Sequence, residues 1–370
     1  MKVLHVITGL GVGGAEQQLR LLLRYLPVEK AECHVVTLTN PGVVAEGIRA
    51  DGTGVTHLGM RGNRDLGAVP RLVRVIRAGG FDLVHTHLYR ACVYGRVAAR
   101  LAGVRAVATE HSLGDSQIEG RPLSAGTRAL YRVTERMGAG TAAVSATVAQ
   151  RLRGWGVADD RIRLVPNGIE PARFRHDPAL RAAVRGRLGL SRADYAVAGV
   201  GRLVPAKRFD LLVRAAAANP ATFLLIAGTG PERGSLLRLA AGLGAADRVM
   251  VVSSEDGGPD VPGVLAAADL FVSPSPEEAF GLAVVEALAA GLPVLYAACP
   301  AIEDLPPHDA PGASRISGDP GQLAAAIGRQ RRAGPVRLAV PAAAEHYHIA
   351  HTADRVLALY ASALASARKK

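Results

Sequence analysis

Short apolar runs alternate along the first half of the chain with longer segments in which apolar residues recur every three or four positions. Continuous apolar runs are typical of strands buried on both faces of a parallel sheet, whereas the longer period is typical of helices packed on one side. The expected strands are Val3–Thr8, His34–Thr39, Leu83–Thr86, Ala106–Thr109, Thr141–Val144 and Ile162–Val165, and the expected helices are Ala15–Tyr25, Ala68–Arg77, Tyr89–Leu101 and Ala146–Arg153.

The second half of the chain repeats this alternation. A strand, a helix and a further strand in succession favour a parallel sheet with helices on its faces, so each half predicts a doubly wound α/β sheet. The expected strands are Ala196–Val200, Thr222–Ala227, Val249–Val252, Leu270–Val272 and Val294–Tyr296, and the expected helices include Phe209–Ala218, Glu232–Leu243 and Gly281–Ala290.

The segment Pro166–Pro178 separates the two halves. It is rich in turn-forming residues and has no clear period, so we interpret it as an interdomain linker. We therefore expect a first domain over residues 1–170 and a second over residues 179–349, followed by a last helix over about 350–367. A chain of 370 residues is long enough for two such cores.

Composition limits the class of protein. The chain is 49% hydrophobic but only 4% aromatic, which suits an α/β protein built from small branched residues. Its three cysteines, Cys33, Cys92 and Cys299, are far apart and indicate a reducing compartment rather than a disulfide framework or a metal site. The N-terminus reads as a first strand and not a signal peptide, and no apolar run approaches the ~20 residues that span a bilayer. We expect a cytoplasmic protein.

Positive charge is concentrated in the first half. Residues 1–180 hold 24 Lys/Arg against 15 Asp/Glu, whereas residues 181–370 hold 20 against 17. This asymmetry favours an acidic partner, although solvated helix faces explain it equally well. Nucleic acid is not expected, because no basic stripe is interleaved with aromatic residues. The helix Val69–Arg77, which carries Arg71, Arg74 and Arg77, suggests peripheral contact with anionic lipid at the inner face of the membrane.

The stretch Ser273–Pro293 carries the main candidate chemistry. Glu278 lies just before the expected helix and Glu286 lies within it. A helix start binds anions because its first N–H groups are unpaired and its dipole is positive there. Two acids flanking such a start suit a ligand with a sugar, a phosphate and a ribose, although an ordinary capped helix is the simpler interpretation. The N–H groups expected to bind phosphate belong to Phe280, Gly281 and Leu282.

The loop Gly9–Gly14 matches the pattern G-x-G-x-x-G between a strand and a helix, which is typical of dinucleotide binding. An NAD-dependent oxidoreductase would place an acid at the end of the second strand to bind the ribose. That strand ends at Thr39–Asn40 without a carboxylate, so this alternative is weak. A glycine loop that allows close approach to the first helix remains.

Two further loops follow expected strands at the edge where doubly wound sheets bind ligands. Arg202 and Lys207 follow Ala196–Val200, and their charges suit a diphosphate. His111 follows the strand that ends at Thr109, where we favour a functional role over a structural one. His85 and His87 have no convincing metal-ligand spacing, and we expect no metal site.

These stretches resemble the retaining GT-B glycosyltransferases, especially glycosyltransferase family 4. Glu278 and Glu286 match the family's E-x7-E signature, and Thr109-Glu110-His111-Ser112 resembles its T-x-H position. The loop GRLVPAKRFD resembles its phosphate loop but departs from it at Arg208 and Phe209, where a glycine and another residue are common.

Three other segments share the resemblance. GVGGAE resembles the family's first glycine loop, where the last glycine of the pair, here Gly14 next to Gly13, approaches the donor phosphate. Gly228–Glu232 resembles its G-x-G-P turn and Asn167–Gly168 its P-N-G motif, although turn chemistry alone explains both. The resemblance implies a GT-B fold, with two domains facing across a cleft and the last helix crossing back to the first.

The resemblance also implies the reaction. A nucleoside diphosphate sugar, with UDP favoured, donates its sugar with retention to an acceptor hydroxyl, without a metal or cofactor. Glu278 and His111 would contact the sugar, Glu286 the ribose, and Arg202, Lys207 and the helix start the leaving phosphate. The alternatives are a GT-B sugar-nucleotide epimerase or a phosphorylase, a non-catalytic binding protein and, less favoured, the oxidoreductase.

Overall fold

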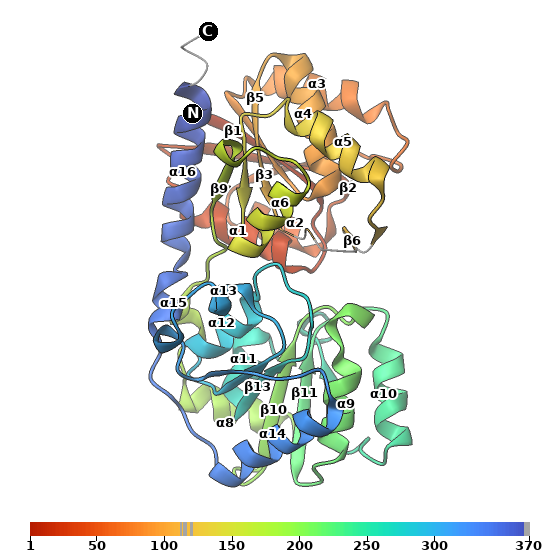
Figure 1. Ribbon diagram of the computed structural model, residues 1–370, viewed down its shortest axis with the longest axis vertical. Helices are drawn as coiled ribbons and strands as arrows, with labels where there is room; N and C mark the ends of the chain where they lie inside the picture. The colour runs from red at the N-terminus through yellow and green to blue at the C-terminus, as the bar shows by residue number, and fades with distance from the viewer. Residues whose placement is uncertain (112, 114–116, 119–120, 366–370) are drawn as a thin grey trace. The chain divides into compact units, whose positions relative to one another are not determined.

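The computed structural model of the protein describes residues 1–111, 113, 117–118 and 121–365. The chain forms two compact units (Figure 1). The first contains Met1–Gly168 together with the C-terminal segment from Ile349, and the second contains Ile169–His348. Among the expected features, Ser112 and residues 366–367 of the last helix lie outside the described residues.

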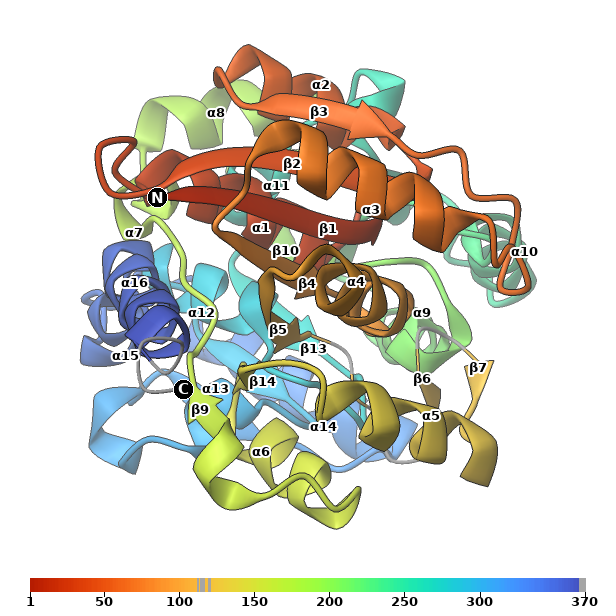
Figure 2. The same ribbon diagram turned by 90° about the horizontal axis from the view of Figure 1, so that it is seen from above.

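The sheet of the first unit has seven parallel strands in the order β3-β2-β1-β4-β5-β8-β9 (Figure 2). Its central strands are apolar and buried on both faces, as continuous apolar runs predict. The strands are β1 (Lys2–Gly9), β2 (Glu32–Asn40), β3 (Gly54–His57), β4 (Leu83–His87), β5 (Arg105–Glu110), β8 (Gly140–Ala143) and β9 (Ile162–Leu164), with a separate antiparallel pair β6 (Gln117–Ile118) and β7 (Arg121–Pro122).

Helices cover both faces of this sheet. One face packs against α3 and α4, and the other packs against α1, α2 and α16. The helices of the unit are α1 (Gly14–Tyr25), α2 (Gly42–Ala50), α3 (Ala68–Gly79), α4 (Tyr89–Ala102), α5 (Ala125–Glu135), α6 (Ala146–Gly154) and α16 (Ile349–Ala365), with a 3-10 turn η1 (Asp159–Arg161).

The last helix, α16, belongs to the first unit although it follows the second in sequence. It buries Ala353, Val356, Tyr360 and Ala363, which are spaced three or four residues apart and form one apolar stripe. The stripe packs with Leu22 of α1, so the predicted return of the last helix to the first unit is confirmed.

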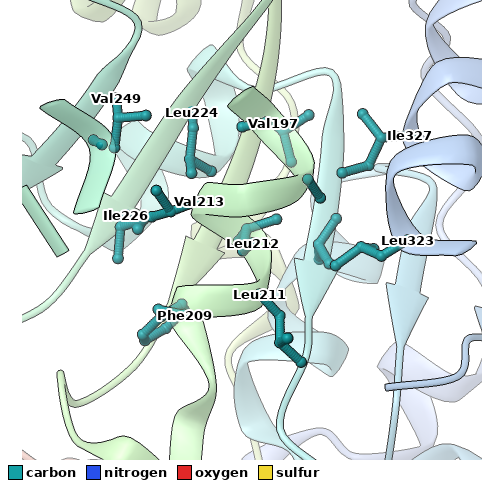
Figure 3. Close-up of a cluster of buried hydrophobic side chains, with 14 of the residues drawn as sticks. Val197, Phe209, Leu211, Leu212, Val213, Leu224, Ile226, Val249, Leu323 and Ile327 are labelled. Atoms are coloured by element: carbon teal, nitrogen blue, oxygen red, sulfur yellow. The ribbon is translucent and has the colours of Figure 1, made fainter. Parts of the chain in front are cut away.

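The second unit has six parallel strands in the order β12-β11-β10-β13-β14-β15. Its core includes Val197, Phe209, Leu212, Leu224 and Ile226 (Figure 3). The strands are β10 (Tyr195–Val200), β11 (Thr222–Ala227), β12 (Val249–Val252), β13 (Leu270–Ser273), β14 (Val294–Tyr296) and β15 (Ala313–Arg315).

The helices of the second unit alternate with these strands. The α-helices are α7 (Pro171–Phe174), α8 (Pro178–Arg187), α9 (Phe209–Ala217), α10 (Arg233–Gly242), α11 (Val261–Ala267), α12 (Leu282–Ala289), α13 (Pro300–Glu303), α14 (Pro320–Ala333) and α15 (Ala342–His346), and the 3-10 turns are η2 (Pro205–Lys207), η3 (Ser254–Asp256) and η4 (Pro307–Asp309).

The predicted pair of doubly wound sheets is confirmed. The structure differs from the prediction at two edge strands, at several helices and in the linker segment. The prediction missed the edge strands β3 and β15, which are short and partly exposed and therefore lack a long apolar run. The helices α2, α5, α8, α11 and α14 were not among those named from the sequence. The segment Pro166–Pro178 is not structureless, because it contains α7 and ends where α8 begins.

In each sheet the strand order reverses at one point, the topological switch point. The order of the first sheet reverses between β1 and β4, and that of the second reverses between β10 and β13. Ligands of open α/β sheets bind beyond the carboxyl ends of the strands at such a switch point. The loops predicted to carry the site follow β1, β5, β10 and β13. No helix in the described part of the chain has the length and apolar character needed to span a bilayer.

Candidate functional site

Two predicted site residues meet at the switch point of the second unit. Lys207 ends η2, on the loop after β10, and Glu278 lies on the loop between β13 and α12. The Lys207 ammonium donates a hydrogen bond to Oε1 of Glu278, and the two side chains are 25% and 15% exposed. The structure therefore joins a cation and a carboxylate that are 71 residues apart in the sequence.

Arg202 lies on the same loop, and its side chain is exposed. The turn that begins at Gly228 supports this loop. A Cβ on Gly228 would lie 1.9 Å from the carbonyl oxygen of Gly201, and one on Gly230 would lie 2.5 Å from that of Leu203. Only glycine allows the two loops to approach so closely. The turn thus positions the loop that carries Arg202.

Arg208, where the sequence departs from the family pattern, adopts a left-handed backbone conformation with φ of +52°. A glycine would adopt this conformation without steric cost, whereas an arginine is strained there. Its guanidinium forms an ion pair with Asp210 at 3.1 Å. The structure therefore explains why glycine is common at this position and why an arginine is still accommodated.

The start of α12 is shaped by Gly281 and Phe280. Gly281 precedes the helix with φ of +100°, and a Cβ there would lie 2.4 Å from Sγ of Cys299. Phe280 is buried with its ring edge-on to Tyr347, at 4.9 Å between centroids. Among the described residues, no side chain caps this helix start and no acid lies in its first turn. Its N–H groups therefore suit an anionic ligand.

Glu286 lies within α12 and is partly buried. Burial raises the pKa of its carboxyl group to about 7, and the positive charge of Arg173 on α7 opposes this shift. Removal from water disfavours the charged form of an acid. Glu286 therefore changes its charge state near neutral pH, where it would act as an acceptor for ligand hydroxyl groups only when ionised.

His111 follows β5 in the first unit, and its ring is half-buried. Burial lowers the pKa of His111 to about 4, and a hydrogen bond from the ring to the Asn167 side chain opposes this effect. The ring is therefore neutral at pH 7. It lines a cavity of about 10 Å³ together with Gln18, Asn167 and other residues of the first unit. Its lining also includes the apolar side chains of Leu19, Leu22 and Val356.

Gly13 and Gly14 are the glycines at which the sequence predicts the donor phosphate to bind. The carboxylate of Glu16 lies close to them in the structure. Gly14 begins α1 and Gly13 precedes it, while Glu16 is the third helical residue. A Cβ on Gly13 would lie 2.3 Å from Oε2 of Glu16. A glutamate at this position folds back over the helix N-terminus as in a capping box. A phosphate at Gly14 would have to approach beside Glu16.

Sequence reasoning missed two buried polar groupings next to His111. His5, His85 and His87, on β1 and β4, are fully buried and close to one another, and Nδ1 of His87 lies 3.2 Å from Nε2 of His111. The spacing of His85 and His87 places both on one face of β4, which was the only sequence clue. The second grouping surrounds Glu110, which accepts a hydrogen bond from the Tyr131 hydroxyl at 2.7 Å.

Arg96 completes that second grouping. Its guanidinium is buried and donates hydrogen bonds to the hydroxyl groups of Tyr131 and Thr141, at 3.2 and 3.1 Å. Burial raises the pKa of Glu110, and the charge of Arg96 opposes the shift. These contacts fix the end of β5 from which His111 follows. No sequence pattern marks them, because they join residues on separate elements.

Two family models together match most of the chain. The sequence model of Glycosyltransferase Family 4 matches residues 12–173, and that of Glycosyl transferases group 1 matches residues 182–330. The D-inositol 3-phosphate glycosyltransferase of Acidothermus cellulolyticus is 34% identical over 81% of this chain and 71% of its own length. The corresponding protein of Catenulispora acidiphila is 31% identical over 86% of this chain and 83% of its own length. The match to the Salinispora tropica protein spans 59% of that relative.

Solved structures show the same architecture. Alr3699/HepE of Anabaena, in complex with UDP and glucose, has a TM-score of 0.84 and 22% identity over 98% of this chain and all of its own. WaaG, a glycosyltransferase involved in lipopolysaccharide biosynthesis, has a TM-score of 0.71 and 18% identity over 96% of this chain and 99% of its own. These similarities confirm the GT-B fold, and the sequence matches confirm the family. The chain is therefore a glycosyltransferase and belongs to glycosyltransferase family 4.

Proposed function

We propose that the protein transfers a sugar from a nucleoside diphosphate sugar to an acceptor hydroxyl, with retention of the anomeric configuration. The observation that carries this proposal is the pairing of Lys207 with Glu278 at the switch point of the second unit. The pair lies next to the start of α12, which no side chain in the described part of the chain caps. A cation and a carboxylate held side by side suit a donor in which a phosphate adjoins a sugar. Structures of Alr3699/HepE with UDP and with UDP-glucose support UDP as the nucleotide.

In this proposal, the diphosphate lies at the N-terminus of α12. The N–H groups of Phe280, Gly281 and Leu282 donate to its oxygens, because helix N-termini favour anions. Arg202 and Lys207 add positive charge as the glycosidic bond breaks and charge develops on the leaving phosphate. These two cations supply the charge stabilisation that a divalent metal supplies in other transferases, so we propose a reaction without a metal or cofactor.

The remaining residues bind the two sugars of the donor. Glu286 accepts hydrogen bonds from the ribose, which does not react. Glu278 and His111 contact the transferred sugar, and Gly13 and Gly14 allow the phosphate to approach α1. The acceptor hydroxyl attacks from the face that the phosphate leaves, and a phosphate oxygen takes its proton. This path retains the configuration without a covalent enzyme intermediate.

We propose a small phosphorylated polyol as the acceptor class. The three relatives described above are named as D-inositol 3-phosphate glycosyltransferases, and positive charge is concentrated in the first half of this chain. A phosphate on the acceptor would be attracted by that charge. Inositol 3-phosphate, free inositol and a neutral sugar therefore form a suitable acceptor panel.

The proposal is tested by thermal shift with UDP-, GDP- and ADP-sugars. A ligand that binds only the folded state raises the melting temperature, so the true donor class should stand out. Turnover with the acceptor panel follows, and proton NMR of the product gives its anomeric configuration. Binding without transfer or donor hydrolysis would indicate a binding protein, and an inverted product would contradict the retaining mechanism.

We also propose that the enzyme works in the cytoplasm, in peripheral contact with anionic lipid through its first unit. On α3, Arg71 is paired with Asp65 at 2.7 Å and Arg77 donates to a backbone carbonyl at 2.8 Å, so Arg74 is the most available of its three arginines. Helix α5 offers a stronger surface, because it exposes apolar and basic side chains together. These are Leu130, Val133, Arg128, Arg132 and, just after the helix, Arg136 and Met137.

Co-sedimentation with vesicles tests this contact. Each arginine near an anionic leaflet contributes ~1 kcal/mol, so binding should be reversible and lost at moderate salt. Exchanging Arg128 and Arg132 for Gln should reduce binding to anionic vesicles, whereas the same exchange at Arg187 of the second unit should not. Equal sedimentation with anionic and neutral vesicles at low salt would contradict the proposal.

A further inference from the structure

The peptide group between Phe280 and Gly281, at the start of α12, is held by the segment that opens α13. The carbonyl oxygen of Phe280 accepts a hydrogen bond from the backbone N–H of Ala301 at 2.9 Å and another from the Cys299 thiol at 3.5 Å. Cys299 immediately precedes α13, and Ala301 lies in its first turn. The two helices belong to the second unit (Figure 1).

These contacts determine where the N–H of Gly281 points. A planar trans peptide directs its C=O and its N–H in opposite directions. Because the Phe280 carbonyl faces Cys299 and Ala301, the N–H of Gly281 faces away from α13. The carbonyl group of Gly281 accepts from the N–H of Val284 at 3.0 Å, so the residue is also fixed on its helix side. This N–H is one of the three that we assign to the donor phosphate.

Glycine at this position makes such contacts necessary. Its φ of +100° and the 2.4 Å between its Cβ position and Sγ of Cys299 exclude larger residues. Glycine, however, adopts positive and negative φ with similar ease, so the peptide group before Gly281 could rotate. In the rotated orientation a carbonyl oxygen, and not an N–H, would face an approaching phosphate and repel it. The two donors of the α13 segment favour the productive orientation.

Both donors are available at neutral pH. Cys299 is fully buried, and burial raises the pKa of its thiol, so the sulfur keeps its proton. The S–H group is a weak donor, and the N–H of Ala301 is a strong one. A carbonyl oxygen has two lone pairs, and the oxygen of Phe280 therefore receives a donor for each.

Tyr347, at the end of α15, contacts both partners of this hydrogen bond. Its buried hydroxyl donates to the carbonyl oxygen of Ala301 at 2.7 Å. Its ring packs edge-on against the ring of Phe280, at 4.9 Å between centroids. Tyr347, Ala301 and Phe280 thus form a closed set in which each residue contacts the other two. One side chain therefore fixes the donor and the acceptor relative to each other.

We propose that Cys299 and Tyr347 are positioning residues for the donor diphosphate. Cys299 holds the carbonyl of Phe280 directly, and Tyr347 holds it through Ala301, so that the N–H of Gly281 is directed at the phosphate. Both side chains are buried and act through the peptide group, without contact with the donor. This inference rests on the proposed function, because it deepens the account of the phosphate site at α12.

The simpler interpretation is that α13 and α15 pack against α12 for stability alone. In that case, loss of either donor would affect every ligand of the folded protein alike. Positioning of the Gly281 N–H instead concerns only ligands that carry a phosphate. UDP and uridine share the nucleoside and differ in the diphosphate, so their affinities distinguish the two interpretations.

Calorimetric titration with UDP and with uridine tests the phosphate role. Tyr347→Phe keeps the ring and removes the hydroxyl, and Cys299→Ala removes the thiol. Each should weaken UDP binding ~3–10-fold, as expected for one hydrogen bond, and leave uridine binding unchanged. Cys299→Ser, which retains a donor, should bind UDP like the wild type. The control is Tyr195→Phe, which removes the hydroxyl of a buried tyrosine at the start of β10 and should change neither affinity.

NMR of the ligand-free protein tests the peptide group itself. Phe280 and Gly281 form the only Phe-Gly pair in the sequence. Labelling phenylalanine with ¹³C at the carbonyl and glycine with ¹⁵N therefore gives a single correlation through this peptide bond. The ¹³C resonance should move upfield in Tyr347→Phe and Cys299→Ala, because the carbonyl loses hydrogen bonding. It should stay in place in Tyr195→Phe, and UDP should move the Gly281 proton downfield in the wild type.

The outcomes separate this inference from the proposed function. A carbonyl resonance that is unchanged in both variants, or equal weakening of UDP and uridine, would overturn the positioning role although UDP binds. A wild-type Gly281 proton that does not respond to bound UDP would overturn it as well. If the wild type bound no UDP, the proposed function and the phosphate role would fail together, whereas the carbonyl shifts would still show whether the peptide group is held.

Discussion

At the residue scale, the carboxyl group of Glu286 determines at which pH the candidate site gains a negative charge. Glu286 has a pKa of about 7 in the folded protein, above its ordinary value of 4.5. The folded state therefore holds this proton more tightly than the unfolded state, so the contribution of Glu286 to stability falls as pH rises from about 4.5 to 7. Glu286→Gln removes that penalty. It should raise the melting temperature at pH 8 but leave it unchanged at pH 4, as calorimetry at the two pH values would show.

The same carboxylate should make donor binding depend on pH. Ionised Glu286 accepts hydrogen bonds from the ribose, and the protonated form accepts less well. The KM for the donor should therefore rise as pH falls below about 7, with little change in kcat. In Glu286→Gln, KM should be high and constant over this range. A wild-type pH dependence confined to kcat would contradict a role in ribose binding.

Arg208 carries a cost that a single exchange should remove. Its left-handed conformation suits glycine, and the exposed ion pair with Asp210 contributes little. Arg208→Gly should raise the free energy of unfolding by ~0.5–1 kcal/mol in urea titrations. Arg214→Gly, an exposed exchange inside α9, should instead lower it by ~1 kcal/mol. Destabilisation of similar size in both variants would show that the strain at Arg208 is not significant.

At the element scale, Gly281 determines where α12 begins. Its φ of +100° is strained for any other residue, and a Cβ there would meet Sγ of Cys299. Gly281→Ala should therefore cost ~1–3 kcal/mol of unfolding free energy and weaken donor binding, because it displaces the N–H groups of the first turn. Gly186→Ala is the control, since Gly186 lies in α8 with open space around its Cβ position.

That control should be neutral or stabilising, because alanine favours a helix more than glycine does. Equal effects of Gly281→Ala and Gly186→Ala on donor binding would show that the start of α12 does not bind the donor phosphate. The comparison isolates the start of the helix, since both exchanges add a single methyl group within the second unit.

At the scale of the whole molecule, the sequence predicted what depends on local pattern. The continuous apolar runs predicted the central strands of both sheets, because those strands are buried on two faces. It missed β3 and α14, whose partly exposed residues leave a weaker pattern. Motif residues such as Lys207 and Glu278 were placed on the correct loops. Their ion pair was not predicted, because it joins segments that only the tertiary fold brings together.

The histidines that meet near His111 show the same limit. His5, His87 and His111 lie on three separate strands or strand ends, and only the strand order makes them neighbours. Likewise, the position of Glu16 against Gly13 depends on how α1 starts and not on the glycine pattern alone. Long-range contacts between polar residues therefore limit prediction of the site more than prediction of the fold.

The central claim is that Arg202 and Lys207 stabilise the leaving diphosphate without a metal. The most direct measurement is kcat for sugar transfer in the wild type, Lys207→Ala and Arg208→Ala, each with and without EDTA. Removing a preorganised charge should lower kcat ~10²–10³-fold in Lys207→Ala, whereas the neighbouring Arg208→Ala should keep most of its activity. EDTA should leave the wild type unchanged. Wild-type kcat in Lys207→Ala, or activity lost with EDTA and restored by manganese, would contradict the account.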